Sequence, residues 1–215
     1  MLKRDYMKEI ENSLKIVRKK VDESIIKKNK ESAEEAINKE LRGLVGLDLA
    51  TINSLDFDSI KEIISREREY NSEKYIALAE LLRLNGMLQE DINEKIYYYN
   101  RALMAYYEGI NDEELLLENY KKYIEEVMSF VSQYELTVKE NIILVWLYEC
   151  MGRYDKAEDI LFMTLKHSNN DEMVIEEGID FYNRLMNADE KKLEAGNLSH
   201  EEVLDGLNVF KSKNK

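Results

Sequence analysis

Apolar residues recur every three or four positions through most of the chain, which is the spacing of an amphipathic helix. The first stripe predicts a helix from about Leu2 to Lys28 and consists of Tyr6, Ile10, Leu14, Val17, Val21 and Ile25. Similar stripes follow, and no segment alternates between apolar and polar residues as a half-buried strand does. The pattern predicts an all-α fold of about ten to eleven helices with no strands.

Polar residues and glycines mark the expected helix boundaries. The spacing of a capping box, in which Ser or Thr precedes Glu by three residues, occurs at Ser32/Glu35, Thr137/Glu140 and Ser199/Glu202. Other helices are expected to begin at Asp58 or Ser59, Ser72, Asp91, Asp112, Asp171 and Asp189. Helices are expected to end at Gly46 (in the left-handed conformation), Gly86 and Gly196.

Residues 141–166, NIILVWLYECMGRYDKAEDILFMTLK, predict two short helices joined by a turn at Gly152. Tyr154 is expected to wedge into the neck of this hairpin, and the small Ala157 lets the helices approach. The motif spacing resembles that of a tetratricopeptide repeat at Tyr148, Gly152, Tyr154, Ala157 and Leu161. Fainter echoes around Ala36 and Ala102 favour a tetratricopeptide-like α-α superhelix over a regular array.

Three further segments resemble one particular family: MLKRDYMKEIE at the start, GLVGLD at 43–48 and GIDFYNRLMNADEKKLEAGNLSHEEVLDGL at 178–207. They are similar to an uncharacterised family of bacterial tetratricopeptide-like proteins. The resemblance implies a single all-helical cytoplasmic domain over residues 1–215 and supplies no catalytic or binding residues. Within it we expect N-terminal helices in 1–70, tetratricopeptide-like hairpins in 71–187 and capping helices in 188–215.

Charge is divided unevenly along the chain, whose net charge is −13. Residues 1–30 hold ten basic and five acidic residues, and the acidic remainder argues against general nucleic-acid binding because it repels phosphate backbones. The basic first helix leaves one alternative, a peptide-sensing regulator whose N-terminal helix contacts nucleic acid. Apolar runs are too short to cross a bilayer, and the single cysteine fits a reducing compartment, so we expect a cytoplasmic protein without membrane contact.

Catalytic motifs are missing from the sequence. His167 and His200 are the only histidines, neither belongs to a metal-binding motif, and no glycine-rich phosphate loop is present. Cys150 falls at the end of a predicted helix, where the helix dipole opposes a thiolate. We therefore expect no enzyme activity, no catalytic residue, no cofactor and no metal.

Tyrosine is the more suggestive residue, because fourteen are present and three stand in a row at 97–99. Adjacent helical positions diverge by about 100°, so these three cannot all face a core. The candidate partner-binding residues are Tyr97, Tyr98, Tyr106, Tyr120 and Tyr123. Alternatively, Tyr99, Tyr107 and Tyr123 fill gaps between helices while Tyr98 and Tyr106 lie on the surface. The sequence favours a non-enzymatic module for an unknown protein or peptide partner, a second copy of the chain included.

Overall fold

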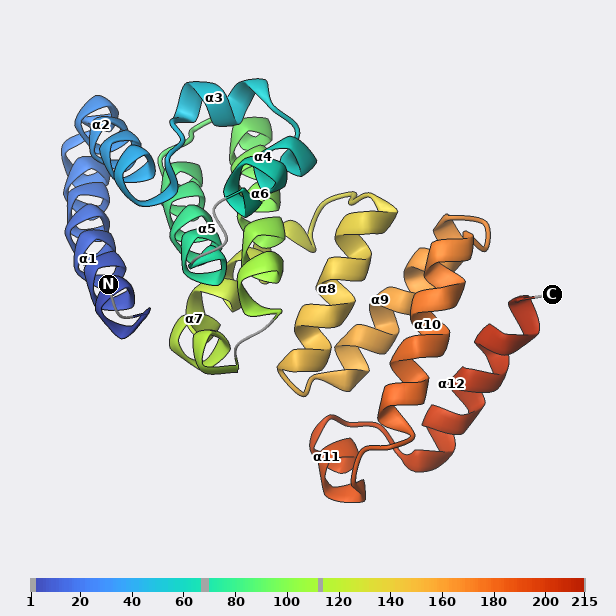
Figure 1. The fold of residues 1–215 in the computed structure, drawn as a ribbon. Helices are drawn as coiled ribbons and strands as arrows, with labels where there is room; N and C mark the ends of the chain where they lie inside the picture. The colour runs from blue at the N-terminus through green and yellow to red at the C-terminus, as the bar shows by residue number, and fades with distance from the viewer. Residues whose placement is uncertain (1–2, 67–69, 112–113, 215) are drawn as a thin grey trace. The chain divides into compact units, whose positions relative to one another are not determined.

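The computed structural model describes residues 3–66, 70–111 and 114–214, and in this part of the chain it contains helices and no strand (Figure 1). The all-α prediction is therefore confirmed. The elements in chain order are α1 (Lys3–Lys27), α2 (Lys30–Glu40), the π-helix η1 (Leu41–Val45), α3 (Leu49–Ser54), α4 (Phe57–Ser65), α5 (Asn71–Met87), α6 (Ile92–Ile110), α7 (Glu114–Val131), α8 (Val138–Cys150), α9 (Tyr154–His167), α10 (Glu172–Leu185), α11 (Glu190–Ala195) and α12 (His200–Lys213). No helix among the described residues is long and apolar enough to span a bilayer.

The chain forms two compact units, Met1–Tyr134 with α1 to α7 and Glu135–Lys215 with α8 to α12. We call them unit 1 and unit 2. The boundary between them falls inside the range 71–187, which the sequence analysis assigned to hairpins. The assignment of the whole chain to a single domain stays a prediction.

Helix α5 is the centre of unit 1, because it is buried on nearly all sides from Tyr75 to Gly86. It packs against α6 over most of its length and also against α1, as Figure 1 shows. Gly86, expected to end this helix, lies inside it. A side chain there would collide with the ring of Tyr99, so the glycine permits the close approach of α6.

Several boundaries of unit 1 differ from those expected. Lys28 adopts the left-handed conformation and the Asn29 N–H donates to the Ser24 carbonyl, which ends α1 and lets α2 begin at Lys30. The Ser32/Glu35 pair therefore lies inside α2 and does not cap it. Ile25, predicted to be buried, is 47% exposed.

Two further boundaries concern α3 and α4. Helix α3 was not predicted. Asp56 is the N-cap of α4, and its side chain accepts a hydrogen bond from the backbone N–H of Ser59. Asp58 and Ser59, the expected first residues, therefore both lie inside α4. Gly46 does end η1 with a φ of +79°, as expected. The expected cap Asp112 lies outside the described residues.

Unit 2 contains the predicted hairpin of α8 and α9, joined through Gly152 with a φ of +68°. The capping boxes Thr137/Glu140 and Ser199/Glu202 both form. The core of the unit joins α8 and α9 to α10 and α12. Gly196 packs against Tyr154, so the residues after α11 cover the neck of the hairpin.

Candidate functional site

The most unusual feature of unit 1 is a buried carboxylate, that of Glu80 on α5, with three hydrogen-bonding partners. Arg18 of α1 places Nε and Nη2 at 3.1 and 2.5 Å from Oε2 of Glu80. Nη2 of Arg83, one turn further along α5, lies 3.2 Å from the same oxygen. The hydroxyl of Tyr106 on α6 donates to Oε1. The Glu80 side chain is fully buried, so this cluster fixes three helices around one charge.

The cluster continues toward the surface through Arg83, whose Nη1 lies 3.0 Å from Oε2 of Glu126 on α7. Glu126 is 40% exposed and also accepts from the hydroxyl of Tyr99 at 3.0 Å. Burial disfavours the charged guanidinium, but Glu80 and Glu126 outweigh it and raise the pKa of Arg83. Burial, followed by Glu80, raises the pKa of Tyr106, so this hydroxyl keeps its proton and acts as a donor.

Tyr123 of α7 contacts both arginines of the cluster. The Cζ atoms of Arg18 and Arg83 each lie 4.4 Å from its ring centroid, within the range of a cation–π interaction. Tyr123 is half-buried. Its ring therefore connects α7 to the guanidinium groups of α1 and α5.

A hollow of about 250 Å³ opens beside Tyr123. We call it the α1–α7 pocket, and its lining residues are Glu11, Lys15, Arg18, Asn119, Tyr120 and Tyr123. Tyr120 is 2% exposed, and its hydroxyl forms no hydrogen bond with any residue that the structure describes. Burial, followed by the charges of Glu11 and Glu80, raises the pKa of Tyr120. Tyr120 thus has a protonated, buried hydroxyl without a partner in the described chain, which is rare for a buried group.

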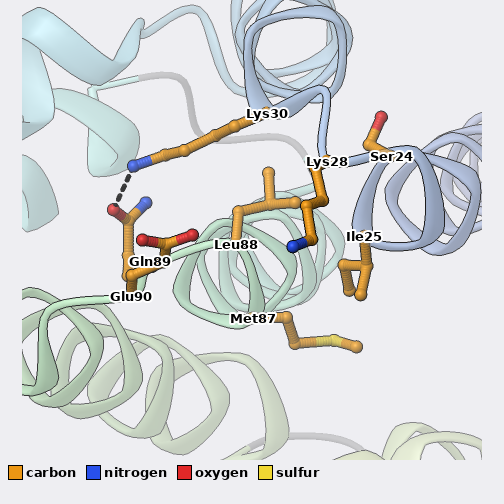
Figure 2. A pocket seen from close by; sticks show the side chains of 8 residues that line it. All are labelled: Ser24, Ile25, Lys28, Lys30, Met87, Leu88, Gln89 and Glu90. Carbon is orange, nitrogen blue, oxygen red and sulfur yellow. Dashed lines mark hydrogen bonds between the residues drawn. The ribbon is translucent and has the colours of Figure 1, made fainter.

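A second hollow of about 240 Å³ lies where α1 and α5 end, and Figure 2 shows its lining residues Ser24, Ile25, Lys28, Lys30, Met87, Leu88, Gln89 and Glu90. The side chains of Lys30 and Gln89 point toward each other there and form a hydrogen bond of 2.6 Å. Lys30 also pairs with Glu34 at 3.3 Å. None of the eight residues has a buried side-chain atom without a partner. This hollow is therefore a weaker candidate for a binding site than the α1–α7 pocket.

The five candidate tyrosines separate into two groups. Tyr106, Tyr120 and Tyr123 meet at the Glu80 cluster and the α1–α7 pocket. Tyr97 and Tyr98 lie at α3, where the Tyr98 hydroxyl accepts from Asn53 at 2.9 Å.

Burial separates these tyrosines differently. Tyr98 and Tyr106 are 8% and 0% exposed, so their placement on the surface is wrong, whereas Tyr99, which the same alternative placed between helices, is 3% exposed. Tyr120 is likewise buried, and only Tyr97 and Tyr123 are half-buried. The buried tyrosines have little area left for direct contact with a large partner.

The five hairpin residues lie in unit 2, as the motif spacing suggested. Ala157 and Leu161 are in its buried core, and Tyr148 and Tyr154 pack against that core. Cys150 is exposed at the end of α8. Among the described residues no group of three His, Cys, Asp or Glu side chains could hold a metal ion. The expectation that the protein needs no metal stays a prediction.

Sequence reasoning missed five charged members of the site and one neutral amide, which are Glu11, Lys15, Arg18, Glu80, Arg83 and Asn119. One signal was present for two of them. Glu80 and Arg83 stand three positions apart in the otherwise apolar segment 75–84, and charges inside a helix that is apolar on every side must pair.

The whole chain, residues 1–215, matches the model of a protein family described as a family of unknown function, DUF6483. The chain belongs to this family. Membership in DUF6483 agrees with the resemblance of the chain to an uncharacterised family, and the match includes both the Glu80 cluster and the α1–α7 pocket. No curated protein and no solved structure gave a significant match.

Proposed function

We propose that this DUF6483 protein is a non-enzymatic interaction module that binds a protein or peptide partner at the α1–α7 pocket. The observation that carries the proposal is the lining of this hollow, in which the exposed Lys15 joins Arg18 and Tyr123, two side chains that the Glu80 cluster holds in place.

The Glu80 cluster supports the same proposal through its rigidity. Arg18 is held by two hydrogen bonds to one carboxylate oxygen and stacks against Tyr123, so two pocket-lining side chains are fixed before a partner arrives. A preorganised site loses less conformational entropy on binding than a flexible one. Buried ion pairs often contribute little more to stability than apolar residues of the same size would. The positioning of Arg18 and Tyr123 in the pocket is therefore the role that we assign to this cluster.

We include the tetratricopeptide-like architecture in the proposal. The α8–α9 hairpin, with its left-handed turn at Gly152 and the small Ala157 in the core, supports it. Such helical hairpins stack into surfaces that hold other proteins. We also propose that the protein acts in the cytoplasm, without a cofactor.

Affinity purification from the native cell tests the proposed function. Three forms of the full chain serve as bait: the wild type, Lys15→Glu in the pocket, and Lys28→Glu, which reverses an exposed lysine of the second hollow. We expect a specific protein with the wild type and with Lys28→Glu, and a recovery reduced by about tenfold with Lys15→Glu. Recovery of no protein above background, or equal recovery with all three baits, contradicts the proposal.

A further inference from the structure

We infer that the exposed face of α9 in unit 2 is a contact surface for a second copy of this chain, and that the two copies meet there around a two-fold axis. We call this surface the α9 face, and its residues are Lys156, Asp159, Phe162, Met163, Lys166 and His167. The inference is independent of the α1–α7 pocket, which belongs to unit 1. It follows from the apolar centre of the face and from the order of the charges around that centre.

Two adjacent apolar side chains occupy the centre of the α9 face. Phe162 and Met163 are 37% and 43% exposed, although the opposite side of the helix is buried in the core of unit 2. The ring of Phe162 also lies 5.3 Å from that of Phe210 on α12, and the next residue along the chain from Phe210, Val209, is exposed as well. Single apolar residues are common on protein surfaces, but Phe and Met side by side are typical of a surface that another protein covers.

The charges of the face are arranged symmetrically about this centre. Asp159 stands three residues before Phe162, and Lys166 stands three residues after Met163. Because Asp159 and Lys166 are two helical turns apart, they lie on the same side of α9, about 10 Å from each other along its axis. When a second α9 packs antiparallel on the first, Asp159 of each copy meets Lys166 of the other. A face with this order of charges is complementary to itself.

Both charges are available for such intermolecular pairs. Lys166 is exposed and makes no ion pair among the residues that the structure describes. Asp159 is exposed and lies 3.4 Å from Lys156, one turn earlier on the same helix. Exposed pairs of this kind contribute little to stability, and a carboxylate accepts from two cations at once. A contact between two copies therefore adds two ion pairs without breaking one within either chain.

The symmetry of the face is the reason for choosing a second copy as its occupant. A two-fold contact uses the same patch on both copies, so each charge needs its opposite at an equal distance on the other side of the axis. An axis that passes between Phe162 and Met163 meets this condition for Asp159 and Lys166. It also places the apolar centre of one copy on that of the other. An unrelated partner would not require this arrangement.

Sedimentation velocity of the full chain tests the inference at concentrations from about 1 µM to about 1 mM, where contacts of modest size associate. We expect the mass to rise from that of one chain to that of two. Asp159→Lys and Lys166→Asp should each raise the dissociation constant by at least about tenfold, because each brings like charges together twice. Met163→Ser should raise it by about tenfold through lost apolar contact. Ile26→Ser, which changes an exposed isoleucine of unit 1, is the control and should leave the dimer unchanged.

An equimolar mixture of the Asp159→Lys and Lys166→Asp chains gives the sharpest result. Each variant repels a copy of itself, but both contacts between the two variants join opposite charges. The mixture should therefore dimerise about as strongly as the wild type. Both substitutions are at exposed positions, so circular dichroism of each variant alone should show the helix content of the wild type.

Four results overturn the inference: the mass of one chain at every concentration, equal association of the wild type and the charge variants, a mixture that stays monomeric, or growth beyond two chains. The last result is excluded by our account because a two-fold contact closes on itself. None of the four concerns unit 1. Capture of a partner through the α1–α7 pocket therefore succeeds or fails separately from this test.

Discussion

Glu80 and Arg83 lie one turn apart on α5 and form an ion pair of 3.2 Å, with side chains that are 0% and 3% exposed. Each member of the pair has a second partner, because Arg18 of α1 also binds Glu80 and Glu126 of α7 also binds Arg83. Removing one member of such a group leaves the others buried without compensation, which costs far more than an exposed pair contributes.

Glu80→Gln should therefore lower the free energy of unfolding by about 3 kcal/mol. The substitution keeps the size of the side chain but leaves Arg18 and Arg83 facing a neutral amide. Urea unfolding followed by circular dichroism measures the effect, and Glu62→Gln on the exposed face of α4 is the control. Equal stability of the two variants would show that the cluster does not hold unit 1 together.

Tyr120→Phe should leave the free energy of unfolding unchanged or raise it by up to about 1 kcal/mol, because it removes a buried hydroxyl that has no partner among the residues the structure describes. Tyr106→Phe is the matched comparison. It deletes the donor to Glu80 and should cost about 1–3 kcal/mol. Thermal unfolding of both variants checks the pair of predictions, and a large destabilisation by Tyr120→Phe would mean that its hydroxyl has a partner within the folded chain.

Local sequence signals predicted what local forces decide. The capping boxes at Thr137 and Ser199, the left-handed Gly46 and the turn at Gly152 depend on neighbouring residues alone, and the structure confirms them. Helix α3 was missed because six residues are too few to show an amphipathic period. Ser32 and Glu35 satisfied the capping-box spacing, yet Lys28 had already turned the chain upstream.

The candidate site was beyond local prediction for a different reason. The contact of Arg18 with Glu80 joins residues 62 positions apart, and it depends on how far α1 is shifted along α5. No periodicity within either helix determines that shift. Tyrosine clustering pointed to α6 and α7, which carry Tyr106, Tyr120 and Tyr123, but burial of Tyr98 and Tyr106 could be known only from the packing of other helices around them.

Stability should depend on pH through Asp48, the N-cap of α3. The Thr51 backbone N–H and hydroxyl, followed by Arg42, lower the pKa of Asp48 from 3.8 to about 2. Because the pKa is lower in the folded state, this stabilisation is present above about pH 4 and is lost as the pH falls toward about 2. The stability advantage of the wild type over Asp48→Asn, measured by urea unfolding across this range, should therefore shrink on acidification. A constant difference contradicts the assignment.

Gly152→Val should cost more than about 1 kcal/mol, because a β-branched residue is strained at a φ of +68°. Apart from Gly152 and its two chain neighbours, no described residue has an atom within 4 Å of the position that a Cβ would occupy, so the cost comes from the backbone and not from crowding. Gly152→Asn is the control and should be tolerated better, since Asn adopts the left-handed conformation more readily. An unchanged melting temperature in the valine variant would show that the turn can take another conformation.

The alternative of a nucleic-acid contact through α1 makes the opposite prediction to ours. Arg18 is bound by Glu80, and Lys27 lies 3.6 Å from Glu23, so part of the basic charge of this helix is already compensated. We expect no mobility shift of double-stranded DNA or of RNA at low ionic strength, where electrostatic binding is strongest. A shift that disappears on addition of salt would favour the regulator instead.

Site-specific photo-crosslinking tests the central claim most directly. A photoreactive amino acid at Asn119, an exposed residue of the pocket lining, reports what touches the α1–α7 pocket in the living cell. The account predicts a discrete adduct with one protein from Asn119 and none from the same group at Glu62 on α4. It also predicts that Lys15→Glu in the same chain abolishes the adduct. No adduct at Asn119, or one that persists after Lys15→Glu, would contradict the claim that this pocket is a binding site.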